Sequence, residues 1–168
     1  NGDIIRGVSA NAADIGLIPT PPSPLSTALK PDGKWDILLN RASLNSLRRH
    51  LKKNISGCEP ELRSNLEQLI KDHSKDFTQW LDDCVEAVAP VIMSAKALLD
   101  VQTIVIAANI EAGFTSQIIS ALQKELNNIT PESRFPPQLV SGTFRSNAGA
   151  VGAASLPIFY NFSPRNKS

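Results

Sequence analysis

The sequence predicts an α/β protein with a small sheet and about five helices, and residues 100–144 carry that prediction. Residues 101–108 form a short, nearly uninterrupted apolar run rich in β-branched side chains, as in a strand covered on both faces. After a turn at residues 109–113, apolar residues recur at helical spacing from Phe114 to Leu126. Residues 138–144 have the pattern of a second strand. A strand, a helix and a strand in this order form a βαβ unit, which implies a parallel sheet.

The first 36 residues contain few regular elements. Prolines at positions 19, 21, 22, 24 and 31 interrupt the hydrogen bonding of helices and strands, so residues 20–36 should form an excursion over the surface. Short strands are expected only around Ile4 and Ile5 and over residues 15–18. The chain opens without an initiator methionine, and residues 1–7 have the pattern of the second half of a hairpin. We therefore expect a fragment of a longer protein.

Two leucine-rich helices are expected next. Ser43 is a suitable N-cap for a helix that ends near Lys53, with the leucines at positions 44, 47 and 51 facing inward. Pro60 suits the first position of a second helix. The first helix also carries four basic residues, which could form a phosphate or nucleic-acid patch. At a helix C-terminus such residues more often complement the helix dipole in water. They are Arg48, Arg49, Lys52 and Lys53.

The longest helix should follow Ser74, which is a suitable N-cap. Apolar residues keep a spacing of three and four from Phe77 to Leu99, densely enough for the central helix of the domain. Pro90 lies inside this pattern. Its missing N–H donor and its ring predict a kink or a break near residues 86–89.

A last helix is expected over residues 147–162. It begins with glycines and alanines three or four residues apart, which leave a smooth face that another backbone can approach closely. Ordinary packing of this face on the sheet is the interpretation we favour. The alternative is a nucleotide in the same gap.

The composition argues against several classes of partner. Seventeen basic and 16 acidic residues nearly balance, so there is no general case for nucleic acid or an anionic membrane. No apolar run approaches the roughly 20 residues of a membrane helix, and no signal peptide is evident. Cys58 and Cys84 are expected to be reduced thiols of a cytoplasmic protein. His50 and His73 lack partners at ligand spacing and are expected at the surface. One domain, residues 1–168, is the default for this length.

The order of these motifs resembles the ROK family of repressors, uncharacterised reading frames and sugar kinases. The strand, turn, helix, proline-containing connection, strand and AGAVGAA sequence are similar to the family's C-terminal lobe. Residues 11–17, NAADIGL, resemble the segment usually written AGEIGH, and residues 41–43 before a helix resemble the next landmark. The resemblance spans essentially the whole chain and is closest to the sugar-responsive repressors. It implies the C-terminal lobe of the actin-like, ribonuclease-H-like fold of the hexokinase and actin superfamily.

Departures from the family pattern limit what the resemblance implies. Asp14 matches the Glu that accepts hydrogen bonds from sugar hydroxyls, although its side chain is shorter. Asp14 and, more weakly, Asn11 are therefore the expected ligand-binding residues. Leu17 replaces a His that contacts sugar and ligates zinc, and residues 20–36 contain no cysteine, so we expect no zinc site. Residues 107–109 replace the glycines against which adenosine lies in family kinases.

These features predict a regulator and not an enzyme. We expect the effector-binding and oligomerising region of a sugar-responsive transcriptional regulator that forms a homodimer or larger assembly, without a cofactor and without membrane association. A sugar or sugar phosphate would change the dimer geometry, and DNA would bind only through a preceding domain. Two alternatives remain open. One is a degenerate sugar kinase, and the other is an assembly domain that has lost its ligand.

Overall fold

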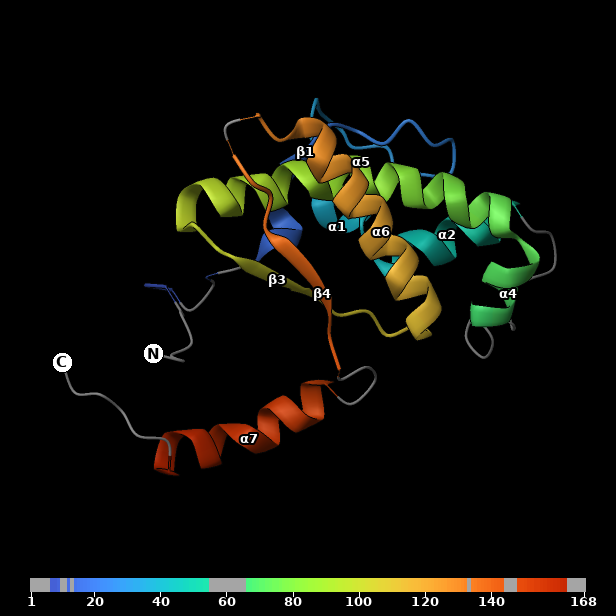
Figure 1. The fold of residues 1–168 in the computed structure, drawn as a ribbon. Coiled ribbons are helices and arrows are strands. Elements are labelled where there is room, and N and C mark those ends of the chain that lie inside the picture. Colours follow the sequence, from blue (N-terminus) through green and yellow to red (C-terminus); the bar gives the residue numbers. More distant parts are fainter. Residues whose placement is uncertain are drawn as a thin grey trace.

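The computed structural model describes residues 7–9, 12, 14–54, 66–132, 134–143 and 148–162. These residues form a mixed α/β structure, which confirms the predicted class (Figure 1). The helices are the 3-10 turn η1 (Ile15–Leu17), α1 (Leu38–Arg41), α2 (Leu44–Asn54), α4 (Leu66–Asp72), α5 (Ser74–Leu99), α6 (Ala112–Ile129) and α7 (Ala148–Phe162). The strands are β1 (Pro19–Thr20), β2 (Asp36–Ile37), β3 (Thr103–Ile106) and β4 (Gln138–Ser141).

The predicted βαβ unit is confirmed. Strands β3 and β4 pair in parallel, with Thr103 opposite Gln138 and Ile106 opposite Ser141, and α6 connects them. The expectation that the β3 segment is covered on both faces is wrong. Exposure alternates along residues 103–110, and the Val105 side chain is 60% exposed. Helices α5 and α6 cover one face of the pair, whereas the other face is open (Figure 1).

The core lies where α5 meets α2, α4 and α6. Leu47 and Leu51 of α2 are fully buried, as their spacing predicted. Phe77 of α5 packs edge-on against Phe114 of α6, with 5.5 Å between ring centroids. Leu122 and Leu126 continue this contact along α6 and are at most 2% exposed. The apolar face of each helix therefore meets the others, which is the main source of stability in a small domain.

Helix α5 covers the stretch predicted for the longest helix and starts one residue earlier than expected. It begins at Ser74, so that His73 and not Ser74 is the N-cap, and no side chain caps it. It runs through Pro90 to Leu99 as one helix, so of the kink or break expected near residues 86–89 the break does not occur. Asp100 ends the helix in the left-handed conformation, at φ 50°. The carboxylate of Asp100 accepts a hydrogen bond from the Lys96 ammonium at 2.6 Å, which ties this end to the preceding turn.

The N-terminal elements differ from the sequence expectation in two respects. Residues 15–17 form a 3-10 turn, so the strand expected over residues 15–18 is wrong. Strands β1 and β2 instead pair antiparallel and close the base of the proline-rich excursion. The short helix α1 follows β2 and was not predicted. The strand expected at Ile4 and Ile5 and the helix start at Pro60 lie outside the described residues.

Helix α7 forms where a last helix was expected, but it does not pack on the sheet as we favoured. A Cβ atom built on Gly149 or Gly152 would meet nothing within 4 Å. Several of its apolar side chains are exposed, with Ile158 at 63% and Phe162 at 80%. It lies apart from α5 and α6, below the β3–β4 pair in Figure 1. If the smooth face of α7 packs closely against another backbone, that backbone must belong to another surface.

Candidate functional site

Asp14, the main ligand-binding candidate, stands at the start of η1. Its carboxylate is exposed and does not cap the turn. Within the described residues the Asp14 side chain makes no hydrogen bond or ion pair. A carboxylate in this condition can accept hydrogen bonds from two hydroxyl groups of one ligand. The second candidate, Asn11, lies outside the described residues, so the structure does not show whether the two side chains meet.

The turn that carries Asp14 is held against α1. The Leu38 amide donates a hydrogen bond to the Ile18 carbonyl at 2.9 Å, and a Cβ atom on Gly16 would lie 3.5 Å from that of Leu39. A side chain at this position would thus be in ordinary van der Waals contact with α1. Ile15 and Leu17, on either side of Gly16, are each 56% exposed. The site thus combines a carboxylate that has no partner in the described part of the chain with an exposed apolar surface, a combination suited to a ligand that has both hydroxyl groups and C–H faces.

A buried ion pair anchors α1 to α5. Arg41 is 1% exposed, and its guanidinium donates to the Asp83 carboxylate at 2.6 and 3.1 Å and to the Asp83 carbonyl at 3.1 Å. It also donates to the Pro21 carbonyl at 2.9 Å, which ties the excursion to the core. This role of Arg41 was not predicted, because nothing in the local sequence distinguishes a buried arginine at the end of α1 from a solvated one.

A second buried contact involves a histidine expected at the surface. His50 is 3% exposed, so that expectation is wrong. Its Nδ1 lies 2.6 Å from Thr27 Oγ1, which fixes the tip of the excursion to α2. Burial lowers the pKa of His50 below its ordinary value of 6.5, although the nearby Asp76 carboxylate acts in the opposite direction. The neutral imidazole is therefore the form that the fold favours.

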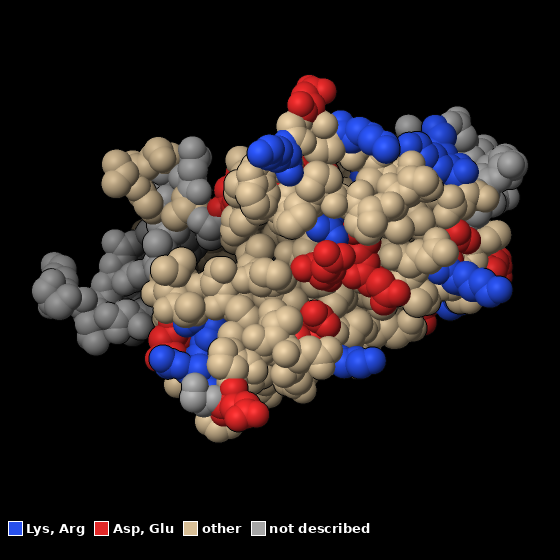
Figure 2. Space-filling model, turned by 90° about the horizontal axis from the view of Figure 1, so that it is seen from above, with Lys and Arg blue, Asp and Glu red and all other residues tan. Residues whose placement is uncertain are grey.

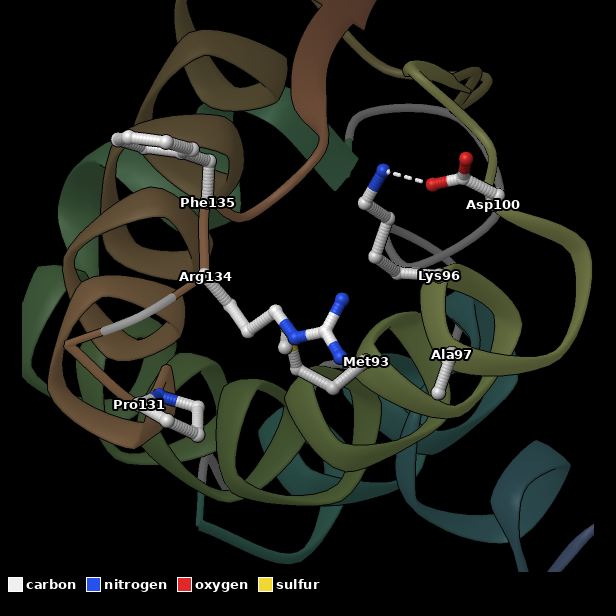
Figure 3. Close-up of a pocket in the computed structure, with 7 residues that line it drawn as sticks. All are labelled: Met93, Lys96, Ala97, Asp100, Pro131, Arg134 and Phe135. Atoms are coloured by element: carbon white, nitrogen blue, oxygen red, sulfur yellow. Dashed lines mark hydrogen bonds and ion pairs between the residues drawn. The ribbon is translucent and has the colours of Figure 1, made fainter.

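A cavity of about 630 Å³ lies elsewhere, beside the C-terminal end of α5. Figure 3 shows the Arg134 guanidinium pointing into it next to Met93, while Lys96 turns toward Asp100. The hydrogen bond from Lys96 lowers the pKa of the Asp100 carboxyl below its usual range. Lys96 lies in the last turn of α5, whose partial negative charge it complements. Asp14 is not among the described residues that line this cavity: Met93, Lys96, Ala97, Asp100, Pro131, Arg134 and Phe135.

Other candidates for chemistry are weak. Burial raises the pKa of the Cys84 thiol to about 12, so this side chain is a poor nucleophile at neutral pH. Among the described residues, no three His, Cys, Asp or Glu side chains lie close enough to hold a metal ion. None of the described helices is long and apolar enough to cross a bilayer. On the face seen in Figure 2, acidic and basic side chains form small separate groups within a largely uncharged surface.

The basic residues of α2 do not all face water. Arg49 is half-buried, and its guanidinium donates to the carbonyls of Asn40 at 2.7 Å and Thr27 at 3.3 Å. Burial lowers its pKa from the ordinary value. One of the four cations is therefore committed to the fold, which weakens the alternative of a phosphate or nucleic-acid patch.

Comparisons with known proteins add no family assignment. No known protein-family model matches the chain, and no curated protein has a significantly similar sequence. The resemblance based on residues 11–17 and 101–154 therefore stays a prediction.

Proposed function

We propose that this chain is the effector-binding and oligomerising region of a sugar-responsive ROK-type transcriptional regulator, with the C-terminal lobe of the actin-like fold. In this proposal the protein is cytoplasmic and is not an enzyme, and DNA binds through another domain. Asp14 contacts a sugar or sugar phosphate, and Asn11 assists it. The ligand acts by binding one dimer geometry more tightly than the other, because only differential affinity can shift the equilibrium.

The observation that carries the proposal is the state of Asp14. An exposed carboxylate with no partner among the described residues, beside Ile15 and Leu17, suits the polar and apolar sides of a sugar ring. The turn is tied to α1 at its C-terminal end, since the Leu38 amide donates a hydrogen bond to the Ile18 carbonyl.

An assembly domain without a ligand is the second candidate. The exposure of α7 favours it, because Ile158 and Phe162 are large apolar side chains that suit a protein interface. Leu17 in place of the family His favours it as well. The protein forms an oligomer under both candidates, and they differ only in whether an effector binds.

A thermal-stability panel separates the candidates. The intact protein would be heated with single monosaccharides and their phosphates, and with ATP in a separate series. A ligand at 100 times its dissociation constant stabilises by about 2.7 kcal/mol, which is a measurable shift. Stabilisation by a sugar and not by ATP supports the regulator. Stabilisation by ATP would revive the degenerate kinase, and no shift across the panel would leave the assembly domain.

A further inference from the structure

Two buried oxygen atoms at the base of the excursion have no hydrogen-bond partner in the described part of the chain. They are Oγ1 of Thr20 and Oδ2 of Asp36. The two residues are only 3% and 5% exposed. Burial of a hydroxyl or carboxylate oxygen without a partner is costly, and nearly all such groups in folded proteins bind protein atoms or ordered water. Both oxygens therefore need a partner.

The two oxygens belong to residues that lie opposite each other in the β1–β2 ladder. Because Thr20 pairs with Asp36, their side chains leave the strands on the same face. That face is buried, whereas Pro19 on the other face is exposed. Opposed residues have Cβ atoms about 4.5–5.5 Å apart. One water molecule bridges two oxygens that are up to about 5.5 Å apart, so it can reach both.

The hydrogen bonds of the other carboxylate oxygen hold Asp36 in place. Its Oδ1 atom accepts hydrogen bonds from the Ile37 amide at 2.8 Å and from the Asn40 side-chain amide at 2.7 Å. The carboxylate is thereby fixed at the start of α1, while the hydroxyl proton of Thr20 can rotate. A water molecule between them can accept the hydroxyl proton and donate to Oδ2. One water thus satisfies an unpaired donor and an unpaired acceptor.

The charges around this position favour water over a cation. Burial lowers the pKa of Arg49, and the nearby Asp36 carboxylate acts in the opposite direction, so the guanidinium already balances that carboxylate. A second guanidinium, that of Arg41, donates to the carbonyl of Pro21, the residue after Thr20. Two fixed positive charges in this region oppose the binding of a metal ion. A neutral water molecule meets no such repulsion.

We propose that the base of the excursion is a binding site for one structural water molecule, which accepts a hydrogen bond from the Thr20 hydroxyl and donates one to the Asp36 carboxylate. Both oxygens are closed to solvent, so this water exchanges only when the excursion opens. Strand β1 directly follows η1 and its C-cap Ile18, and β2 directly precedes α1. The water therefore helps to hold the turn that carries Asp14. The inference is independent of effector binding.

Oxygen-17 magnetic relaxation dispersion tests the proposal, because it counts the water molecules that stay inside a protein longer than it takes to tumble. Thr20→Val keeps the shape of the side chain and removes the hydroxyl, so the intact protein should lose one long-lived water. Thr20→Ser keeps the hydroxyl and should retain it. The matched control is Thr78→Val, whose exposed hydroxyl donates to the Ser74 carbonyl, and it should leave the count unchanged. An unchanged count in Thr20→Val would overturn the proposal.

A second set of measurements needs only the wild-type protein. A crystal structure that resolves ordered water should show one molecule within hydrogen-bonding distance of Thr20 Oγ1 and Asp36 Oδ2. A direct hydrogen bond between the two side chains would overturn the proposal. The midpoint of urea denaturation should be the same in sodium, potassium and calcium salts at equal ionic strength. Stabilisation by one of these cations that Thr20→Val abolishes would replace the water with a metal ion. None of these outcomes depends on whether a sugar stabilises the protein.

Discussion

Replacing Asp83 by alanine should be among the most destabilising single changes in the protein. Asp83 is 5% exposed and is the main partner of Arg41, which is 1% exposed. The substitution leaves the buried guanidinium with two neutral carbonyl acceptors and the exposed Glu86 carboxylate at 3.3 Å. Water screens the charge of Glu86, and the guanidinium cannot reach water without opening the contact between α1 and α5.

The expected cost is about 3–5 kcal/mol of the free energy of unfolding, the usual range when one member of a buried pair is removed. Glu86 provides a matched control, because it lies one turn further along α5 and contacts the same guanidinium at 3.3 Å. Its side chain is 64% exposed, so water screens the interaction, and Glu86→Ala should cost less than about 1 kcal/mol.

Urea denaturation followed by circular dichroism measures the free energy of unfolding of both variants, provided that its dependence on urea concentration, the m-value, is unchanged. Asp83→Asn serves where the alanine variant is too unstable to purify, because it keeps an acceptor for the guanidinium and should fall between the two. If Asp83→Ala cost no more than Glu86→Ala, the buried pair would not anchor α1, and our explanation of how η1 is held would be wrong.

Three further predictions concern the core and its buried groups. Because burial lowers the pKa of His50, the unfolded chain binds a proton more readily than the folded one, so the free energy of unfolding should fall as the pH drops below about 6.5. Urea titrations from pH 7.5 to 5 should show this fall, and His50→Asn should flatten it. Leu47→Ala should lower the free energy of unfolding by about 2–5 kcal/mol, as measured by denaturation. Leu39→Ala should lower it little, because Leu39 is 52% exposed. In a Cys58→Ser background, Cys84 should resist a thiol reagent at pH 8 in the native protein and react in urea, since its pKa is about 12; rapid native reaction of this variant would contradict the burial of Cys84.

The βαβ unit could be predicted because its signals are local. The β-branched run before residue 107 and the helical spacing from Phe114 onward each fix one element without reference to distant residues. The cover on the second face of β3 could not be predicted. The same run suits a strand with one open face, and only the packing of distant elements decides between the two.

The buried polar contacts were harder to foresee. His50 follows Leu47 by three residues and precedes Leu51, so it lies on the inward side of α2. That spacing was an available signal, but the basic neighbours suggested a solvated end. Arg41 gave no such signal, because its partner Asp83 lies 42 residues away in the sequence. Long-range pairs of this kind are decided by packing and not by local pattern.

The sequence predicted which residue belongs to the site, but not the conformation of the chain around it. The sequence and its family resemblance selected Asp14, and the structure adds that the carboxylate is exposed and unpaired among the described residues. The conformation around it was mistaken, because the apolar pair of Ile15 and Leu17 fits a strand as well as a 3-10 turn. The turn places Gly16 beside Leu39 of α1, a contact that the local sequence does not reveal.

The most direct test of the proposed function is a calorimetric titration of the sugar that gives the largest thermal shift. The wild-type protein would be compared with Asp14→Asn and with Asp32→Asn, an exposed carboxylate in the excursion that serves as the control. Loss of a charged hydrogen-bond acceptor is worth about 1.5–3 kcal/mol, so Asp14→Asn should weaken binding roughly tenfold to a hundredfold. Asp32→Asn should leave the dissociation constant unchanged. Equal affinity for the wild type and Asp14→Asn would contradict the assignment of this carboxylate to the effector site.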